Sequence, residues 1–141
     1  MNYRVDPHSL VPPSQQLVAA VLDAIATGEL GVGDRLPSVR GLAAEALVNP
    51  NTVTKAYRDL EHLGATAGRN GSGVFVTTAG PDVARGIRLA ETADAFRRAA
   101  AQALRAGHEA ASLGEILAAA LRPVVAGPTA GSGSGDRGER T

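Results

Sequence analysis

Residues 36–63 read LPSVRGLAAEALVNPNTVTKAYRDLEHL, and they contain two helix starts in quick succession. Ser38 follows a proline and can cap a short helix by accepting a hydrogen bond from a backbone N–H. Asn49 offers a second cap, and Pro50 suits the first helical position, where its missing N–H costs nothing. Two helices separated by about four residues predict a helix-turn-helix.

Apolar residues recur at helical spacing through the N-terminal half of the chain. They predict an earlier helix over about residues 14–27, delimited by Pro13 and Gly28. Gly64 is the expected stop of the third helix. The second and third helices are each expected to bury one stripe, made up of Val39, Leu42, Ala43, Ala46, Val53, Ala56, Tyr57, Leu60 and Leu63.

The period changes after Gly64 and predicts a β-hairpin. Residues 65–68 and 74–78 are the expected strands, and the glycine-containing residues 69–73 join them. A hairpin directly after a helix-turn-helix is the layout of a winged helix. We therefore expect a mostly α protein with a small β-hairpin, in which residues 10–78 form a winged helix-turn-helix domain.

Two more helices are expected towards the C-terminus. Residues 82–106 form one long helical segment, and Ser112 with Glu115 has the spacing of a capping box that begins a last helix reaching about residue 122. Both helices are rich in alanine and too few to bury both faces within one chain. Residues 81–124 are therefore predicted to form a homodimerisation region whose interface contains Val83, Ile87, Phe96, Leu113, Ile116, Leu117 and Leu121.

Composition excludes several classes of protein. The 141 residues contain no cysteine, which excludes a disulfide scaffold, a cysteine-based zinc site, an iron–sulfur cluster and a thiol nucleophile. No apolar run of about 18 residues occurs, and the N-terminus lacks the pattern of an export signal, so a cytoplasmic protein without a membrane span is expected. Residues 127–141 contain no Val, Ile, Leu, Met or Phe and are expected to be a disordered tail.

Catalytic chemistry has little support in the sequence. The three histidines, His8, His62 and His108, lie too far apart along the chain to form a metal-binding pair on one helix. Residues 68–73 contain Gly-x-x-Gly-x-Gly, but neither a Lys-Ser/Thr ending nor a helix follows, so a hairpin is a better interpretation than a phosphate loop. We expect no enzyme activity, no cofactor and no metal.

The polar face of the third helix favours nucleic acid instead. Opposite the apolar stripe lie Asn51, Thr52, Lys55, Arg58 and His62, each able to donate a hydrogen bond. Short side chains at the N-terminal end and basic ones a turn later suit insertion into a major groove. A merely solvated face is the simpler interpretation of this helix alone, but the helix before it and the wing after it favour DNA binding.

Charge supports this assignment locally rather than globally. The formal net charge of the chain is zero, so the composition does not by itself indicate a nucleic-acid partner. Between residues 35 and 58, however, the chain has four basic residues and one acidic residue, Glu45. The basic residues are Arg35, Arg40, Lys55 and Arg58.

Three ordered motifs resemble the GntR-type bacterial regulators, in particular the small YtrA subfamily. They are GELGVGDRLPSVR at residues 28–40, NPNTVTKAYRDL at residues 49–60 and GSGVFV at residues 71–76. The resemblance implies a winged-helix DNA-binding domain on a homodimer that represses transcription from a pseudo-palindromic operator. It also implies a phosphate contact for Arg40 and a wing tip at Gly71 that approaches the minor groove. The full set of residues expected to contact double-stranded DNA is Arg35, Ser38, Arg40, Asn49, Asn51, Thr52, Thr54, Lys55, Arg58, Arg69, Asn70, Gly71, Ser72 and Gly73.

The sequence also departs from the family pattern. Leu47 stands where the family usually has glycine between the two helices, which predicts either a strained turn or a longer second helix. Pro50 replaces an arginine that many members have, so no base preference follows from the resemblance. Ala65 replaces a large aliphatic residue and predicts a thinner first wing strand.

Two alternative functions follow from the same sequence. A winged helix used for protein docking would expose an apolar patch on the third helix. A small-molecule sensor would enclose an effector between the C-terminal helices and point polar residues inward, for which Arg88, Asp94 and Arg98 are the candidates.

Overall fold

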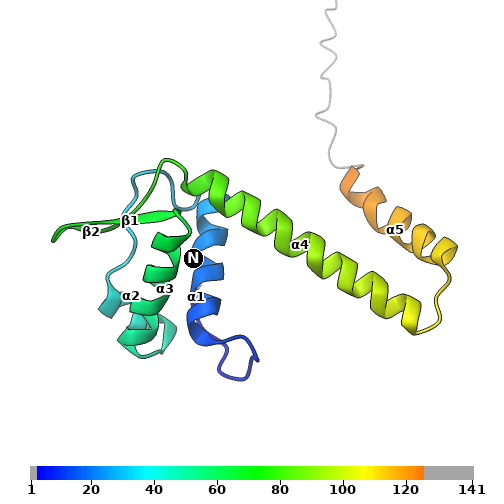
Figure 1. Cartoon of the computed structure of the whole chain (residues 1–141), viewed down its shortest axis with the longest axis horizontal. Coiled ribbons are helices and arrows are strands. Elements are labelled where there is room, and N and C mark those ends of the chain that lie inside the picture. Colours follow the sequence, from blue (N-terminus) through cyan, green and yellow to red (C-terminus); the bar gives the residue numbers. More distant parts are fainter. Residues whose placement is uncertain (1–2, 126–141) are drawn as a thin grey trace, which may run out of the picture. The chain divides into compact units, whose positions relative to one another are not determined.

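The computed structural model describes residues 3–125, which form five helices and two strands (Figure 1). The described residues fall into two compact units that divide between Asp94 and Ala95. The predicted fold class is confirmed, whereas the predicted tail of residues 127–141 lies outside the described part. The elements in chain order are α1 (Pro13–Ala26), α2 (Val39–Ala46), α3 (Pro50–His62), β1 (Thr66–Arg69), β2 (Gly73–Val76), α4 (Gly80–Arg105) and α5 (Ala110–Val125).

The core of the first unit lies between α1, α2 and α3. Leu17 and Val21 of α1, Leu42 of α2 and Leu60 of α3 have at most 1% of their surface exposed. Leu63 departs from the predicted stripe with 42% exposed, because α3 ends at His62 and the chain turns away at Gly64. The rest of the predicted stripes is buried, apart from Val39, which is half-buried against the core.

The N-terminal segment belongs to this core as well, although the sequence predicted a domain beginning at residue 10. Tyr3 and Val5 have only 3% and 9% of their surface exposed. Two alternating apolar residues are too short a pattern to predict a buried segment. The side chain of Gln16 fixes the following turn, because its amide donates to the carbonyls of Asp6 and Val11.

The wing contains one more paired segment than the sequence predicted. β1 and β2 are antiparallel, with Thr66 opposite Val76 and Arg69 opposite Gly73. The loop before α2 pairs with the other edge of β2, where Leu36 N–H donates to Val74 O at 2.8 Å and Val76 N–H donates to the carbonyl of residue 34 at 2.9 Å. The wing is therefore tied to the start of α2 by backbone hydrogen bonds.

The turn between α2 and α3 adopts the geometry that glycine would favour. Leu47 has φ 58° and ψ 48°, so α2 ends at Ala46 and is not lengthened. A left-handed conformation costs a non-glycine residue about 1–2 kcal/mol. Because 73% of the Leu47 surface is exposed, no packing of its side chain explains the residue, and the surrounding helices must hold the turn.

The C-terminal helices differ from the prediction at one start. α5 begins at Ala110, before Ser112, and Glu109 O accepts from Leu113 N–H at 3.0 Å. The predicted capping box at Ser112 is therefore wrong, because the first turn forms two residues earlier. α5 also continues past Pro123.

The first turns of α4 pack on the core of their own chain. Ala84 is fully buried there, and Val83 and Ile87 are half-buried against the same cluster. These two residues are predicted at a homodimer interface, and that prediction stays a prediction, because both keep part of their surface exposed. Across the described residues, no helix combines the length and apolarity that crossing a membrane requires.

Candidate nucleic-acid interface

Side-chain caps fix the N-terminal ends of α2 and α3, as the sequence predicted. Ser38 Oγ accepts from Gly41 N–H at 3.0 Å, and Asn49 Oδ1 accepts from Asn51 N–H at 2.8 Å. The first turn of α3 is satisfied internally, because Pro50 has no N–H and the Thr52 N–H donates to Asn49 O at 2.9 Å. Arg40 lies exposed in the first turn of α2.

The polar face of α3 is open to solvent. Asn51, Thr54, Lys55 and Arg58 are exposed, and Thr52 is half-buried. The hydroxyl of Thr54 donates to the carbonyl of Pro50 at 3.2 Å, so it is held against the helix. Because Val53, Ala56, Tyr57 and Leu60 anchor the opposite side, the exposed side chains sit on a rigid element.

A tyrosine joins α3 to the segment that precedes α2. The hydroxyl of Tyr57 donates to Pro37 O at 2.7 Å, and burial raises the pKa of Tyr57. Tyr3 lies in the same core, where burial and the charge of Glu45 raise its pKa to about 12. Both groups stay protonated at neutral pH, so this contact is a fixed positional constraint on the two helices.

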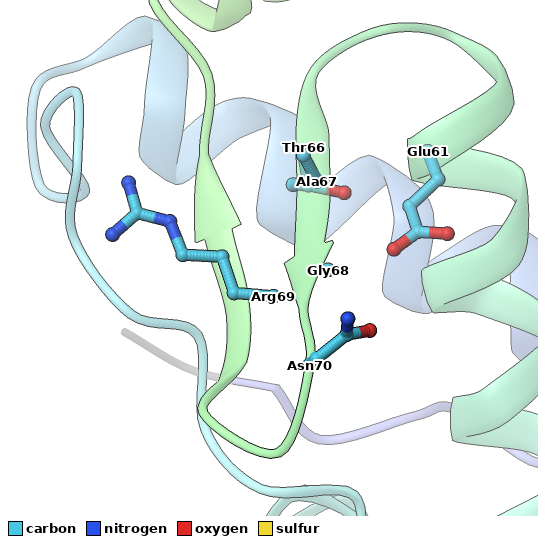
Figure 2. A pocket seen from close by; sticks show the side chains of 6 residues that line it. All are labelled: Glu61, Thr66, Ala67, Gly68, Arg69 and Asn70. Atoms are coloured by element: carbon cyan, nitrogen blue, oxygen red, sulfur yellow. The ribbon is translucent and has the colours of Figure 1, made fainter.

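The tip of the wing consists of exposed residues. Gly71 has φ 72°, a left-handed conformation that glycine adopts without penalty. Arg69, Asn70 and Ser72 flank it and are exposed. Figure 2 shows the Arg69 side chain reaching across β2, on the opposite side of β1 from Glu61.

The predicted DNA-contacting cations have no carboxylate partner within the described residues. This group comprises Arg35, Arg40, Lys55, Arg58 and Arg69. Arginines of α4 differ, because Arg85 pairs with Asp82 at 2.6 Å and Arg88 pairs with Asp23 at 3.0 Å. The five cations thus stay free of ion pairs within residues 3–125, although Glu45 on α2 and Asp59 and Glu61 on α3 balance the formal charge of those two helices.

A hollow in the first unit lies beside β1 (Figure 2) and brings a single carboxylate, Glu61, near the hydroxyl of Thr66 and the amide of Asn70. Among residues 3–125 no group of three His, Cys, Asp or Glu side chains could hold a metal ion.

The second unit has an apolar groove between the end of α4 and α5. Its volume is about 240 Å³, and every lining side chain is apolar, namely Phe96, Ala99, Ala100, Ala103, Leu113, Ile116, Leu117 and Ala120. Phe96 and Ile116 each have 56% of their surface exposed, and Leu121 nearby has 48%. The predicted interface residues of this unit therefore lie together at a surface. Of the polar candidates for an effector site, Arg88 is engaged by Asp23.

Two features of the site were not predicted from the sequence. Phe75 was placed only in a strand, but its ring carries the Arg69 guanidinium 4.6 Å from its centroid. Gly73, which is predicted to contact DNA, lies under the side chain of Arg35, whose Nε is 2.6 Å from the position of a Cβ there. Both contacts are diagonal, because strand register puts Arg35 opposite Phe75 and Arg69 opposite Gly73.

Known proteins resemble this chain over the winged helix. Residues 13–76 match the model of the bacterial regulatory proteins of the gntR family. The chain is 38% identical over 74 residues to the HTH-type transcriptional repressor YtrA of Bacillus subtilis, covering 52% of the chain and 57% of YtrA. It is 40% identical over 78 residues to the HTH-type transcriptional regulator Rv1152 of Mycobacterium tuberculosis, covering 55% and 64%. The chain thus matches less than two thirds of the length of each relative.

Solved structures extend the likeness beyond the wing. A transcriptional regulator from Oenococcus oeni has a TM-score of 0.69 at 30% identity, covering 83% of this chain and 97% of that one. YtrA from Sulfolobus acidocaldarius, a GntR-family transcription factor, has a TM-score of 0.53 at 32% identity, covering 66% and 99%. The chain belongs to the GntR family of bacterial regulatory proteins and is a YtrA-like member of it.

Proposed function

We propose that this protein is a cytoplasmic, sequence-specific DNA-binding transcriptional regulator that acts as a repressor and binds a pseudo-palindromic operator as a homodimer. The observation that carries the proposal is the exposed N-terminal face of α3, where capped polar residues lie beside unpaired cations. A protein-docking winged helix would need large apolar side chains on that face, and none of the exposed large hydrophobic residues lies in α3.

The proposed site divides into base readers and phosphate contacts. Asn51 and Lys55 lie on the exposed face of the first turns of α3 and can reach base edges in a major groove. Arg40 lies at the start of α2, which in a helix-turn-helix crosses the DNA backbone. Phosphate contacts position a protein on the duplex, and base contacts specify the sequence.

Binding-site selection from a random duplex library tests this function. We expect the full chain to enrich a two-fold symmetric site whose half-sites lie about one helical turn apart. On that site Asn51→Ala or Lys55→Ala should each cost about 1–3 kcal/mol and relax selectivity at one base pair per half-site. Arg40→Ala should weaken binding to all duplexes equally and lower the salt slope by about 1.

Arg85 provides the matched control for this experiment. Arg85→Ala removes an exposed arginine that is already paired with Asp82, so it should leave the selectivity unchanged. If no sequence is enriched, or if Asn51→Ala and Lys55→Ala leave the ratio of operator to scrambled affinity untouched, α3 does not read sequence.

The homodimer and repressor parts of the proposal rest on the second unit and on the relatives. The groove on α4 and α5 exposes Phe96 and Ile116, and its lining offers nothing polar to an effector. A second copy of the same apolar surface would cover it in a two-fold arrangement. YtrA of Bacillus subtilis is a transcriptional repressor, and a reporter gene placed behind the selected site should be silenced by this chain.

A further inference from the structure

We propose that Arg35 and Arg69 form a paired phosphate-binding site on the outer face of the wing, with Phe75 as the residue that positions Arg69. This inference deepens the proposed function and rests on it, because it names the part of the duplex that the wing contacts. The partner is a backbone phosphate of double-stranded DNA, next to the groove that α3 enters.

Strand register places both arginines on the same face. Directly opposite residues of antiparallel strands point to the same side, and successive residues alternate. Arg35 pairs with Phe75, and Arg69 pairs with Gly73 two residues away on β2, so the four positions share one face. The other face carries Thr66 and Val76, which are buried against the domain, so the shared face points outward.

Gly73 gives the Arg35 side chain room on this face of the wing. A Cβ at Gly73 would lie 2.6 Å from Nε and 3.3 Å from Cζ of Arg35, so the guanidinium occupies the space that a side chain would fill. That space is the cross-strand neighbour of Arg69. Arg35, which comes from the loop before α2, thus lies over the position opposite Arg69, and the Arg69 guanidinium lies over Phe75, the position opposite Arg35.

Phe75 holds the second arginine over the strand. The Arg69 guanidinium lies 4.6 Å from the centre of the Phe75 ring, within the range of a cation–π contact. Phe75 is half-buried, so its ring is a fixed platform, whereas an exposed arginine would otherwise sample many rotamers.

The charges of Arg35 and Arg69 favour an anionic ligand at this site. Neither arginine forms an ion pair with a described residue, and two guanidinium groups over neighbouring same-face positions of β2, Gly73 and Phe75, repel each other. A phosphate offers each of them acceptor oxygens that match the planar fork of arginine.

Salt titration of DNA binding tests the pair. Affinities of the full chain for the selected site and for a scrambled duplex are measured between about 50 and about 200 mM salt. Arg35→Ala and Arg69→Ala should each weaken binding to both duplexes by the same factor. Each should also lower the salt slope by about 0.9, so that the affinity lost across this salt range shrinks about threefold per arginine removed.

The role of Phe75 is tested by coupling. Phe75→Leu keeps an apolar side chain but removes the ring face, and Phe75→Tyr keeps that face. We expect Arg69→Ala to weaken binding several-fold less in the Phe75→Leu background than in the wild type. Phe75→Tyr should bind as the wild type does, and thermal melting checks that each variant is folded.

Three results would overturn the inference. Unchanged salt slopes in both arginine variants would place the pair off the DNA. A loss confined to the selected site would mean that the arginines read base edges or groove shape. Additive effects of Phe75→Leu and Arg69→Ala would reduce Phe75 to a structural residue. These failures leave the proposed function intact if the wild type still prefers its selected site. A wild type that binds all duplexes equally, with slopes that follow the arginines, would overturn the proposed function and keep the pair.

Discussion

Leu47 combines a left-handed backbone conformation with a largely exposed side chain. Its φ of 58° disfavours any residue with a Cβ, and its side chain is 73% exposed. Leu47→Gly should therefore raise the free energy of unfolding by about 0.5–1 kcal/mol, since relief of the left-handed strain exceeds the entropy that glycine adds to the unfolded chain. Urea denaturation of the full chain measures this.

Leu63 provides a matched control for that substitution. It is also an exposed leucine that closes a helix, but its φ is −71°. Leu63→Gly should lower the free energy of unfolding by about 0.5–1 kcal/mol, because the glycine relieves no strain. If both variants are destabilised alike, the Leu47 side chain makes a contact that its exposure conceals.

The two tyrosines differ in whether their buried hydroxyl has a partner. Tyr57 donates to Pro37 O at 2.7 Å, whereas the hydroxyl of Tyr3 is buried with no partner among the described residues. Tyr57→Phe should cost about 1 kcal/mol of stability, because it leaves a carbonyl unsatisfied. Tyr3→Phe should be neutral or stabilising. Equal losses in urea denaturation would contradict this difference.

The same tyrosines predict how stability changes at alkaline pH. Burial raises the pKa of Tyr3 from 10.0 in the unfolded chain to about 12, and it raises the pKa of Tyr57 as well. Folded values above the unfolded one give stability that is complete below pH 10 and is lost as pH rises towards 12. The chain has two tyrosines and no tryptophan, so ultraviolet absorbance of tyrosinate follows both directly. Native protein should show almost no tyrosinate at pH 10, whereas urea-unfolded protein should be half ionised; a native signal of that size would refute the burial of these hydroxyls.

At the scale of elements, the tip of the wing makes a prediction about backbone conformation. A Cβ at Gly71 would meet nothing within 4 Å, so a substitution there causes no clash and acts through φ 72°. Gly71→Val should reduce affinity for DNA severalfold with little change in melting temperature, since valine disfavours this conformation. Gly71→Asn is the control and should bind nearly as the wild type does, because asparagine tolerates left-handed backbone. Wild-type affinity of the valine variant would mean that the wing tip lies away from the duplex.

Element starts show what the sequence could and could not predict. Ser38 and Asn49 cap the helices that were expected of them, because a cap depends on its own short-range hydrogen bond. Ser112 had the same signature but does not cap α5. The helix begins two residues earlier, at Ala110, and the Leu113 N–H donates to Glu109 O. The pairing of the loop before α2 with β2 depends on residues 40 positions apart, and no local pattern encodes it. The stacking of Arg69 on Phe75 depends in turn on strand register.

At the scale of the whole molecule, a substitution at Phe96 tests whether the protein forms a homodimer. Phe96 lines the apolar groove of the second unit with 56% of its surface exposed. Phe96→Asp should weaken self-association by about 2–4 kcal/mol, as expected for a central aromatic residue of an interface, and should lower DNA affinity with it. Sedimentation at micromolar concentration measures the first effect.

Leu89 supplies the matched control for assembly. It is an exposed α4 residue outside the groove, with 71% of its surface accessible. Leu89→Asp introduces the same charge and should leave sedimentation unchanged. A wild type that sediments as a monomer would defeat the homodimer, and equal dissociation of both variants would place the interface elsewhere on α4.

Two internal hydrogen bonds at the start of α3 determine which hydrogen-bonding groups of Asn49 and Thr54 remain available. The Asn49 amide oxygen accepts the Asn51 N–H, which holds the amide against the helix start and leaves both N–H donors of its NH₂ group unused. The Thr54 hydroxyl donates its one proton to the Pro50 carbonyl, so its oxygen remains as an acceptor only. The Asn49 NH₂ group can give a proton to guanine O6 or N7 or to thymine O4, while Thr54 can receive one from adenine N6 or cytosine N4. The two bonds thus leave Asn49 with unused donors and Thr54 with an unused acceptor, and base edges that contacted both would have to present an acceptor to Asn49 and a donor to Thr54.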